Sequence, residues 1–244
     1  MEETKKISPI VIFGIILGAS IVVSTLVAGG FFYKIKSFDN ALSVTGSAKK
    51  SVTSDSVKWS SQITRVAKVS ALKSGYDQMA TDIVAVKEFL KQNGIEESQV
   101  QITPVFMNEI YNQYATAESK QYTLVQNIEI QSPDVQKITA ISKSTGPLID
   151  KGVVFSTTGL EYYVSTLPQM RVELLSDALK DAKDRADKLA TSTGRTVGSL
   201  KSASSGVVQV LSANSTDVSD YGSYDTSKIE KDVMVTVKAS FTVN

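Results

Sequence analysis

The chain has 244 residues and a formal net charge of +1, and this length is enough for one large or two small domains with a hydrophobic core. It contains no cysteine and no histidine, which excludes disulfides, thiol nucleophiles, zinc sites built from Cys and His, Ser-His-Asp triads and histidine acid–base catalysis. The near-zero net charge gives no broad basic surface of the kind that binds DNA or RNA, so we expect no nucleic-acid partner.

An uncharged, apolar stretch occupies residues 7–33 near the N-terminus. A helix needs about 20 apolar residues to cross the hydrocarbon core of a bilayer, so the stretch predicts a single membrane-spanning anchor. The alternative is a signal peptide cleaved at the weak site Leu26–Ala28. The apolar part of a signal peptide is normally only about 7–15 residues long, and the length therefore favours the uncleaved anchor.

Lysines flank this stretch on both sides, Lys5 and Lys6 before it and Lys34 and Lys36 after it. The cytoplasmic flank of a membrane helix usually carries the excess of positive charge, and with two lysines on each side the charges give almost no preference for either orientation. We expect the N-terminus on the inner side of the cytoplasmic membrane and the bulk of the chain on its outer side.

The apolar stretch also contains rows of small residues. Such rows let membrane helices approach closely, although small residues are also common in these helices. The rows are formed by Gly14, Gly18, Ser20, Ser24 and Ala28.

Residues 41–48 and 55–67 are predicted to form two strands joined by a turn. Trp59, the only tryptophan, shares one face of the second strand with apolar side chains, so we expect it to anchor the core, half buried, and not to bind a ligand. Residues 70–93 have apolar side chains at alternating steps of three and four, which predicts an amphipathic helix ended by Gly94. These apolar positions are Leu72, Tyr76, Met79, Ile83, Val86 and Leu90.

Two further strands are predicted at residues 100–110 and 121–131, joined by a polar tip. Pro104 cannot donate a backbone hydrogen bond, so it places the first of these strands at a sheet edge or at a bulge. Tyrosines gather around the tip, at Tyr111, Tyr114 and Tyr122. They form either an aromatic contact surface or ordinary hairpin side chains half covered by their neighbours.

A short helix is predicted at residues 132–146, capped by Ser132 and ended by Gly146, and a strand at 153–164. The long helix 167–194 follows, again with apolar side chains at steps of three and four. Its stripe comprises Val172, Leu175, Leu179, Ala182, Ala186 and Leu189, with an alanine row at Ala178, Ala182, Ala186 and Ala190. The alanines suit close packing against a sheet. Aspartates on the opposite face lie beside cations, which indicates a charge-paired surface better than catalytic carboxylates. They are Asp177, Asp181 and Asp184.

The last segment is predicted to hold a strand at residues 200–211, interrupted at 202–206, and a second strand at residues 231–244. The second alternates apolar and polar side chains, which predicts a sheet covered on one face only. The loop 212–228 between them has three aspartates, Asp217, Asp220 and Asp225, that invite a calcium interpretation. Their spacing does not match an EF-hand, and the composition favours a solvated loop. We therefore predict no metal site and no cofactor.

The order strand–helix–strand–strand extends from residue 55 to 131 and recurs from 153 to 243. We predict an α+β fold in which an N-terminal transmembrane helix precedes two βαββ units with mostly antiparallel sheets. The predicted divisions are 1–36 for the cytoplasmic tip and the anchor, 37–132 for the first unit, 133–152 for the linking helix and 153–244 for the second unit.

Three stretches of the sequence resemble the SIMPL-domain proteins, a family once labelled a domain of unknown function. They are SVTGSAKKSVTSD at 43–55, YTLVQNIEIQSPDVQKITAISKSTG at 122–146 and ALKDAKDRADKLATSTGRTVGSL at 178–200. The last is similar to the family's helix-to-strand signature of spaced alanines and a glycine. The resemblance rests on ordered blocks and not on a catalytic motif. It implies an exported envelope protein loosely linked to envelope and oxidative stress, with some relatives that form large rings around an internal cavity.

We therefore expect a non-enzymatic, membrane-anchored envelope protein that assembles into a ring-like homo-oligomer with a scaffold or stress-related role. The expected contact surfaces are the hairpin 108–122 and the acidic loop 212–228. A regular strand such as 231–244 leaves an edge that a neighbouring subunit would pair. The alternative is a binding module for a peptide, glycan or lipid at the outer face of the membrane. We predict no catalytic, cofactor-binding or metal-binding residues.

Overall fold

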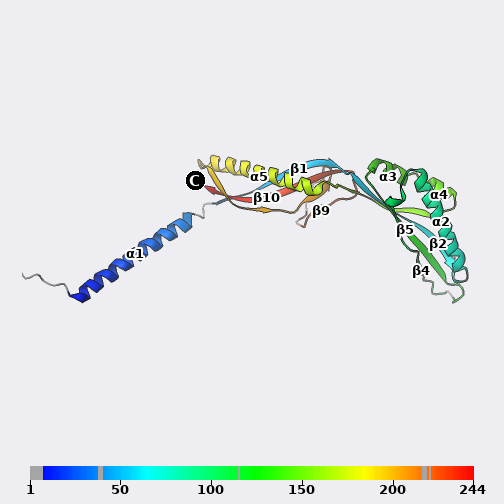
Figure 1. The fold of residues 1–244 in the computed structure, drawn as a ribbon, viewed down its shortest axis with the longest axis horizontal. Coiled ribbons are helices and arrows are strands. Elements are labelled where there is room, and N and C mark those ends of the chain that lie inside the picture. Colours follow the sequence, from blue (N-terminus) through cyan, green and yellow to red (C-terminus); the bar gives the residue numbers. More distant parts are fainter. Residues whose placement is uncertain (1–7, 38–40, 115, 216–218, 220) are drawn as a thin grey trace, which may run out of the picture. The chain divides into compact units, whose positions relative to one another are not determined.

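The computed structural model describes residues 8–37, 41–114, 116–215, 219 and 221–244. The chain divides into two compact units that alternate along the sequence. Unit 1 comprises Met1–Ser47, Leu175–Gly206 and Thr236–Asn244, and unit 2 comprises Ala48–Leu174 and Val207–Val235. Helices lie on sheets whose strand pairs are almost all antiparallel (Figure 1), which confirms the α+β class.

The N-terminal helix is α1 (Pro9–Ser37). Its segment Pro9–Phe32 has 24 residues with a mean hydropathy of 2.7, and none of it is buried. At about 1.5 Å per residue this segment is roughly 36 Å long, which is enough to cross a hydrocarbon core of about 30 Å. The helix thus has the length and composition of a membrane anchor, and a signal sequence would share both. Residues 1–7, the expected cytoplasmic tip, lie outside the described residues.

Unit 2 contains a five-stranded antiparallel sheet, here called the β5 sheet. Its strands are β2 (Ser56–Lys68), β3 (Val100–Ile102), β4 (Phe106–Ile110), β5 (Gln121–Ser132) and β6 (Phe155–Tyr163). β5 pairs with β2 on one side and with both β3 and β4 on the other, and β6 pairs with β2 at the far edge. Pro104 lies between β3 and β4. Its place at the sheet edge confirms the expectation and explains why the strand predicted at 100–110 is broken.

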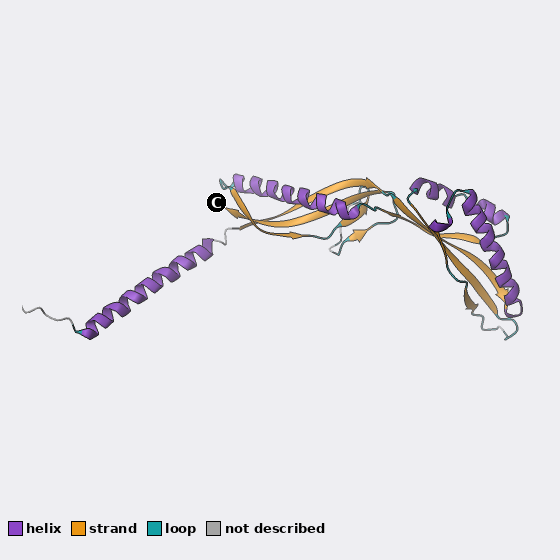
Figure 2. Cartoon of the chain, viewed as in Figure 1, coloured by secondary structure: helices purple, strands orange, loops and turns teal. Residues whose placement is uncertain are grey.

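Helices α2 (Leu72–Gln92) and α3 (Val135–Ser142) pack on one face of the β5 sheet, and α4 (Gly146–Asp150) packs against α2 (Figure 2). The core between helices and sheet contains the buried side chains of Trp59, Ile63, Met79, Val86, Leu124, Ile128, Ile138 and Leu148. Trp59 donates from its indole N–H to the hydroxyl of Thr157 at 3.1 Å and meets the ring of Phe155 edge-on. It is fully buried, so its role as a core anchor is confirmed and it lies deeper than expected.

The buried face of α2 differs in one respect from the predicted stripe. Tyr76 is 42% exposed, whereas Gly75 and Asp82 are buried. Asp82 can be buried because Arg65 on β2 donates two hydrogen bonds to its carboxylate, at 2.6 and 2.8 Å. A sequence pattern counts apolar positions, so it misses a buried carboxylate that has a charged partner on another element.

The predicted helix 132–146 is also shorter than expected. It ends at Ser142, and Gly146 begins α4 instead of ending the helix. The capping residue is Asp134, whose side chain accepts a hydrogen bond from the backbone N–H of Lys137 at 3.0 Å. Ser132 lies before the cap and accepts a hydrogen bond from the N–H of Asp134.

A second five-stranded sheet, here called the β10 sheet, is built around the C-terminal strand. Its strands are β1 (Ala41–Thr53), β7 (Val197–Ser205), β8 (Gln209–Ser212), β9 (Ser223–Tyr224) and β10 (Glu230–Val243). β10 pairs with β1 and, antiparallel, with β7 and β8, and β9 adds parallel to β8. Val233, Val235 and Val237 are buried, and the residues between them are less so, which confirms a sheet covered on one face.

Helix α5 (Leu167–Ser192) runs along the β10 sheet (Figure 1). The alanine row is buried, but Val172 and Leu189, which the predicted stripe includes, are 70% and 52% exposed. The reason is that the backbones of β1 and α5 lie very close to each other within unit 1. A Cβ atom at Gly46 of β1 would lie 2.8 Å from the Cα atom of Ala182, so only residues as small as alanine fit on this face.

The two self-contained βαββ units are not confirmed. β6, the expected first strand of the second unit, pairs with β2 in the β5 sheet. The β10 sheet instead takes β1 from the start of the soluble region. A hydrophobic pattern reveals the order of elements, but the partner of a strand depends on contacts that are distant in sequence. The divisions at 37–132, 133–152 and 153–244 stay a prediction.

Candidate functional site

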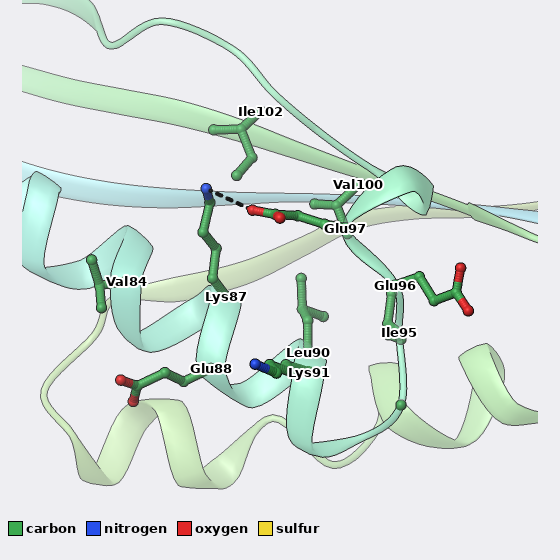
Figure 3. Close-up of a pocket in the computed structure, with 11 residues that line it drawn as sticks. Val84, Lys87, Glu88, Leu90, Lys91, Ile95, Glu96, Glu97, Val100 and Ile102 are labelled. Atoms are coloured by element: carbon green, nitrogen blue, oxygen red, sulfur yellow. Dashed lines mark hydrogen bonds and ion pairs between the residues drawn. The ribbon is translucent and has the colours of Figure 1, made fainter.

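A groove lies in unit 2 between the C-terminal part of α2 and the short edge strand β3 (Figure 3). Its volume is about 860 Å³, and ligand pockets usually have volumes of about 300–1,000 Å³. The lining residues come from α2, from the turn that follows it, from the 3-10 turn Glu97–Gln99 and from β3. The groove is therefore built from one continuous segment of the chain.

The floor of the groove is apolar. Leu90 is 2% exposed and Ile95 is 5% exposed, and both belong to the core of unit 2. Val100 and Ile102 of β3 form a wall and are partly buried against the same core. Val84 extends the apolar surface along α2 and is 53% exposed. An aliphatic side chain buried here would be stabilised by about 1.5–3 kcal/mol relative to water.

The turn after α2 shapes one end of the groove. Gly94 has a φ of 67°, the left-handed conformation that glycine adopts most readily. The N–H of Ile95 donates to the C=O of Leu90 at 3.0 Å, and the N–H of Gly94 donates to the C=O of Lys91 at 2.9 Å. This helix-ending arrangement folds the residue after the glycine back against the last helical turn. It places Ile95 beside Leu90 and sends the chain on toward β3.

Ion pairs occupy part of the rim. The Nζ atom of Lys87 lies 3.3 Å from the carboxylate of Glu97, and this pair crosses the groove (Figure 3). Glu88 lies 3.4 Å from the Nζ atom of Lys151 in unit 2. Exposed pairs of this kind contribute only about 0–1 kcal/mol to stability, so a ligand can displace them at little cost.

Two further charged side chains line the rim, those of Glu96 and Lys91. The carboxylate of Glu96 accepts a hydrogen bond from the hydroxyl of Ser98 at 3.4 Å, and the C=O of Glu96 accepts one from the backbone N–H of Gln99 at 3.0 Å within the 3-10 turn. Lys91 is exposed and forms no ion pair with any residue that the structure describes. The rim therefore presents one cation that is free to meet an anionic group.

The backbone of β3 is covered on one side only. The N–H of Thr103, just beyond β3, donates to the C=O of Asn127 at 3.0 Å. Hydrogen-bonded and non-hydrogen-bonded pairs alternate in an antiparallel ladder, so Gln101 also bonds to β5, and the N–H and C=O of Ile102 point away from it. Among the described strands, none pairs with this outer side.

The expected contact surface at the hairpin is also exposed. Phe106 pairs in register with Val125, and Ile110 with Gln121, so both lie on the face opposite the buried Leu124. We define the hairpin patch as Phe106, Ile110, Tyr111 and Tyr114, which are 49%, 37%, 88% and 84% exposed. Tyr122, the third tyrosine of the predicted cluster, is partly buried. The patch thus includes two of the three tyrosines.

The loop 212–228 is the other expected contact surface. Tyr221 is 97% exposed, and Tyr224 of β9 is 37% exposed. Asp217 and Asp220 lie outside the described residues, and Asp225 accepts hydrogen bonds from the N–H and hydroxyl of Ser227 at 2.6 and 2.8 Å. Within the described ranges no group of three or more His, Cys, Asp or Glu side chains is placed to hold a metal ion.

A buried lysine fastens this loop to the β10 sheet. Lys231 has no exposed surface, and its ammonium group donates a hydrogen bond to the C=O of Asp225. The ring of Tyr224 lies 5.8 Å from the same Nζ atom. Burial lowers the pKa of Lys231, and the charge of Asp225 acts in the opposite direction. The alternating pattern of the last strand gave no indication of a buried cation.

Two of the three aspartates predicted on the exposed side of α5, Asp177 and Asp181, form ion pairs, and none is present for Asp184 among the described residues. Asp177 lies 3.3 Å from the Nζ atom of Lys180, and Asp181 lies 2.8 Å from the Nε atom of Arg185. Asp181 also accepts a hydrogen bond from the backbone N–H of Ser47 at 2.8 Å. That hydrogen bond, followed by the one from Arg185, holds the pKa of Asp181 below its ordinary value. Asp181 therefore ties β1 to α5 within unit 1.

The groove itself was not predicted from the sequence. Val84 and Ile95 lie outside the apolar stripe of the predicted helix, and the single strand predicted at 100–110 concealed the short edge strand β3. One signal was available. An isoleucine directly after the helix-ending Gly94 is typical of a chain that folds back on the last helical turn.

Comparison with known proteins gives a family match. The family described as "SIMPL: Protein of unknown function (DUF541)" matches residues 42–243. The match therefore covers both sheets and the helices that pack on them. No curated protein matches the chain.

Proposed function

The chain belongs to the SIMPL family, and from this premise we propose that it is a non-enzymatic envelope protein that assembles into a ring-like homo-oligomer. In this proposal α1 stays uncleaved and anchors the chain in the cytoplasmic membrane, with the N-terminus inside and the sheets outside. The assembly serves as a scaffold or in a stress-related role.

The observation that carries the proposal is the hairpin patch. Phe106 and Ile110 lie on an edge strand, and Tyr111 and Tyr114 follow at the tip, all of them exposed. Aromatic side chains are enriched in protein interfaces, and a strand edge with exposed apolar side chains tends to pair with another chain. The hairpin patch therefore suits a subunit contact better than contact with water.

Two other features support assembly. A single apolar helix would hold all copies in one membrane and raise their effective concentration. The loop 212–228, with the exposed Tyr221, offers a second surface that differs from the hairpin patch. A contact between two different surfaces is head-to-tail, and it gives a ring when the rotation closes.

The absence of enzymatic activity is proposed from composition. Without histidine and cysteine, catalysis would rest on carboxylates, lysines or tyrosines. Asp177 and Asp181 of α5 are engaged by cations, and Lys231 is bonded to the backbone of its own loop. These groups have structural partners that account for their positions.

Light scattering of the full-length chain in mild detergent tests the proposal. We expect a mass well above that of the 26.3 kDa monomer. The double variant Phe106→Asp with Ile110→Asp should run as a monomer, because it places two charges in the contact. The matched control is Val172→Asp, on a side chain of α5 that is 70% exposed, and it should keep the assembly. A monodisperse monomer, both for the full-length chain and for residues 34–244, would contradict the proposal.

The second candidate function is a binding module for a peptide, glycan or lipid at the outer face of the membrane. The groove between α2 and β3 favours it, because an apolar floor is combined there with a free strand edge and an unpaired cation. This function and self-assembly use different surfaces of unit 2.

A further inference from the structure

We infer that the groove between α2 and β3 binds an extended peptide segment of another protein. The segment adds as a strand to the free edge of β3, places apolar side chains on the floor and pairs an acidic side chain with Lys91. This inference deepens the second candidate function and is independent of self-assembly.

The backbone of β3 selects the chemical class of the partner. Ile102 directs its N–H and C=O away from β5, and Val100 directs its C=O the same way while its N–H donates to the C=O of Glu97. An extended peptide presents donors and acceptors at the spacing of a strand, so it can bond to these groups as an added strand. Acyl chains lack such donors, and a sugar does not repeat them at this spacing.

The side chains of β3 orient the partner over the floor. Val100 and Ile102 share one face of the strand and are partly buried, whereas Gln101 is exposed on the other. Side chains of an added strand lie beside those of its neighbour on the same face. Alternate side chains of the peptide would therefore face Leu90 and Ile95, which are nearly fully buried and wholly apolar. Branched aliphatic residues at every second position fit this floor best.

The rim adds a preference for negative charge. Glu97 and Glu88 are paired with Lys87 and Lys151, but Lys91 has no ion pair within the described part of the chain. An acidic side chain that follows the apolar residues of the peptide would meet Lys91 at the end of α2. The pair would be partly shielded from solvent once the groove is filled, which strengthens it relative to an exposed pair.

Other occupants satisfy the groove less completely. An acyl chain would cover Leu90 and Ile95 but leave the backbone groups of Ile102 unpaired, and unpaired groups that lose water are costly. Strand β4 of a second copy carries Glu109, but this carboxylate already lies 2.9 Å from the Nζ atom of Lys120. The peptide of another protein is the occupant that uses floor, edge and cation together.

Phage display on the full-length chain in phosphatidylcholine nanodiscs tests the inference. The probe is a library of random dodecapeptides, selected on the unchanged chain alone, and the Val84→Asp chain is used only in the titrations that follow. The enriched peptides are synthesised with a fluorescein label and titrated by fluorescence polarisation. We expect them to alternate branched apolar residues and to contain Asp or Glu, and we expect Val84→Asp to weaken binding by about tenfold or more, because it places a charge on the groove wall.

Backbone methylation of the peptide provides a control that leaves the protein unchanged. N-methylation of the peptide amide that bonds to Ile102 should weaken binding by about tenfold, the order expected when a buried hydrogen-bonding group is left unpaired. Methylation of the adjacent amide, which points away from β3, should have little effect. Lys91→Glu should weaken the acidic peptides, and Lys91→Arg should retain them.

Several outcomes would overturn the inference. One is a selection that enriches no peptide, and another is a set of enriched peptides that bind the Val84→Asp chain equally well. A third is equal binding of the two methylated peptides, and a fourth is displacement of the labelled peptides by lauric acid. Binding that is lost in the Phe106→Asp chain but kept in Val84→Asp would also overturn it, because the peptides would then occupy the hairpin patch. Light scattering of the same samples reports self-assembly separately, so failure of one proposal is distinguishable from failure of the other.

Discussion

The two long helices lie on their sheets by different means. In unit 1, α5 meets β1 through Gly46 and the alanine row, with no side chain larger than a methyl group at the closest point. In unit 2, α2 is close to its sheet at Gly75, but Met79, Phe89 and Leu90 follow toward its C-terminal end. Larger side chains hold a helix farther from a sheet, and the groove lies beside that end of α2. A larger side chain should therefore destabilise the contact between α5 and β1, whereas a smaller side chain should destabilise the contact between α2 and its sheet.

The largest effect is expected from truncation in unit 2. Met79 is fully buried, and Met79→Ala should destabilise the chain by about 2–5 kcal/mol, through lost burial and the cavity that it leaves. Urea denaturation followed by the fluorescence of Trp59 measures this, because Trp59 lies in the same core. Val84→Ala, at a position that is 53% exposed, should change stability by no more than about 0.5 kcal/mol. Equal effects of the two variants would show that α2 is not held by its large side chains.

Gly46→Ala is expected to give the next largest effect. A Cβ atom there would meet the backbone of α5, which cannot move aside as a side chain can, so we expect a loss of about 3 kcal/mol, near the upper end for overpacking. The sign of the change in unfolding free energy shows whether the site is crowded, since Gly→Ala at an unstrained position stabilises by about 0.4–1 kcal/mol. Gly159→Ala is the control, because no atom lies within 4 Å of its added Cβ. Thermal unfolding followed by circular dichroism should separate the two. A stable Gly46→Ala variant would mean that the contact between β1 and α5 is loose.

Ala182→Leu tests the same contact from the helix side. Ala182 is fully buried, and the larger side chain should cost about 1–3 kcal/mol, somewhat less than at Gly46 because a leucine can adjust its rotamer. Lys183→Leu, on the exposed neighbouring position, should stay within about 0.5 kcal/mol. Chemical denaturation of both variants gives the comparison. No difference between them would place the alanine row in contact with solvent.

The smallest effect concerns pH. The pKa of Asp181 is lowered in the folded chain, first by the N–H of Ser47 and then by Arg185. A carboxylate with a lowered pKa binds fewer protons when folded than when unfolded, so its contribution to stability is present above the unfolded pKa and is lost as the pH falls through the folded pKa. Asp181→Asn should therefore flatten the fall of the melting temperature below about pH 4. A profile identical to that of the unchanged chain would show that Asp181 does not hold β1.

Hydrophobic periodicity predicted the elements better than their partners. The final strand and helices α2 and α5 lie where the patterns placed them, because one buried face imposes a period on the sequence. The centre of the α5 face shifted to the alanine row, since close approach to Gly46 outweighed the hydrophobicity of Val172 and Leu189. The pairing of β6 with β2 and the exposure of β3 depend on distant contacts, which a local pattern does not contain. The groove follows from those contacts and was missed with them.

β10 follows all strands of the β5 sheet in the sequence, and this sets an order of events during synthesis. All strands of the β5 sheet lie between residues 56 and 163, so that sheet can close while the rest of the chain is still being made. β1 ends at Thr53, but its partner β10 begins only at Glu230. At about 5–20 residues per second, β1 waits roughly 10–35 s for its partner. For that interval the segment that becomes β1 has no strand to pair with, because β10 is its neighbour in the sheet.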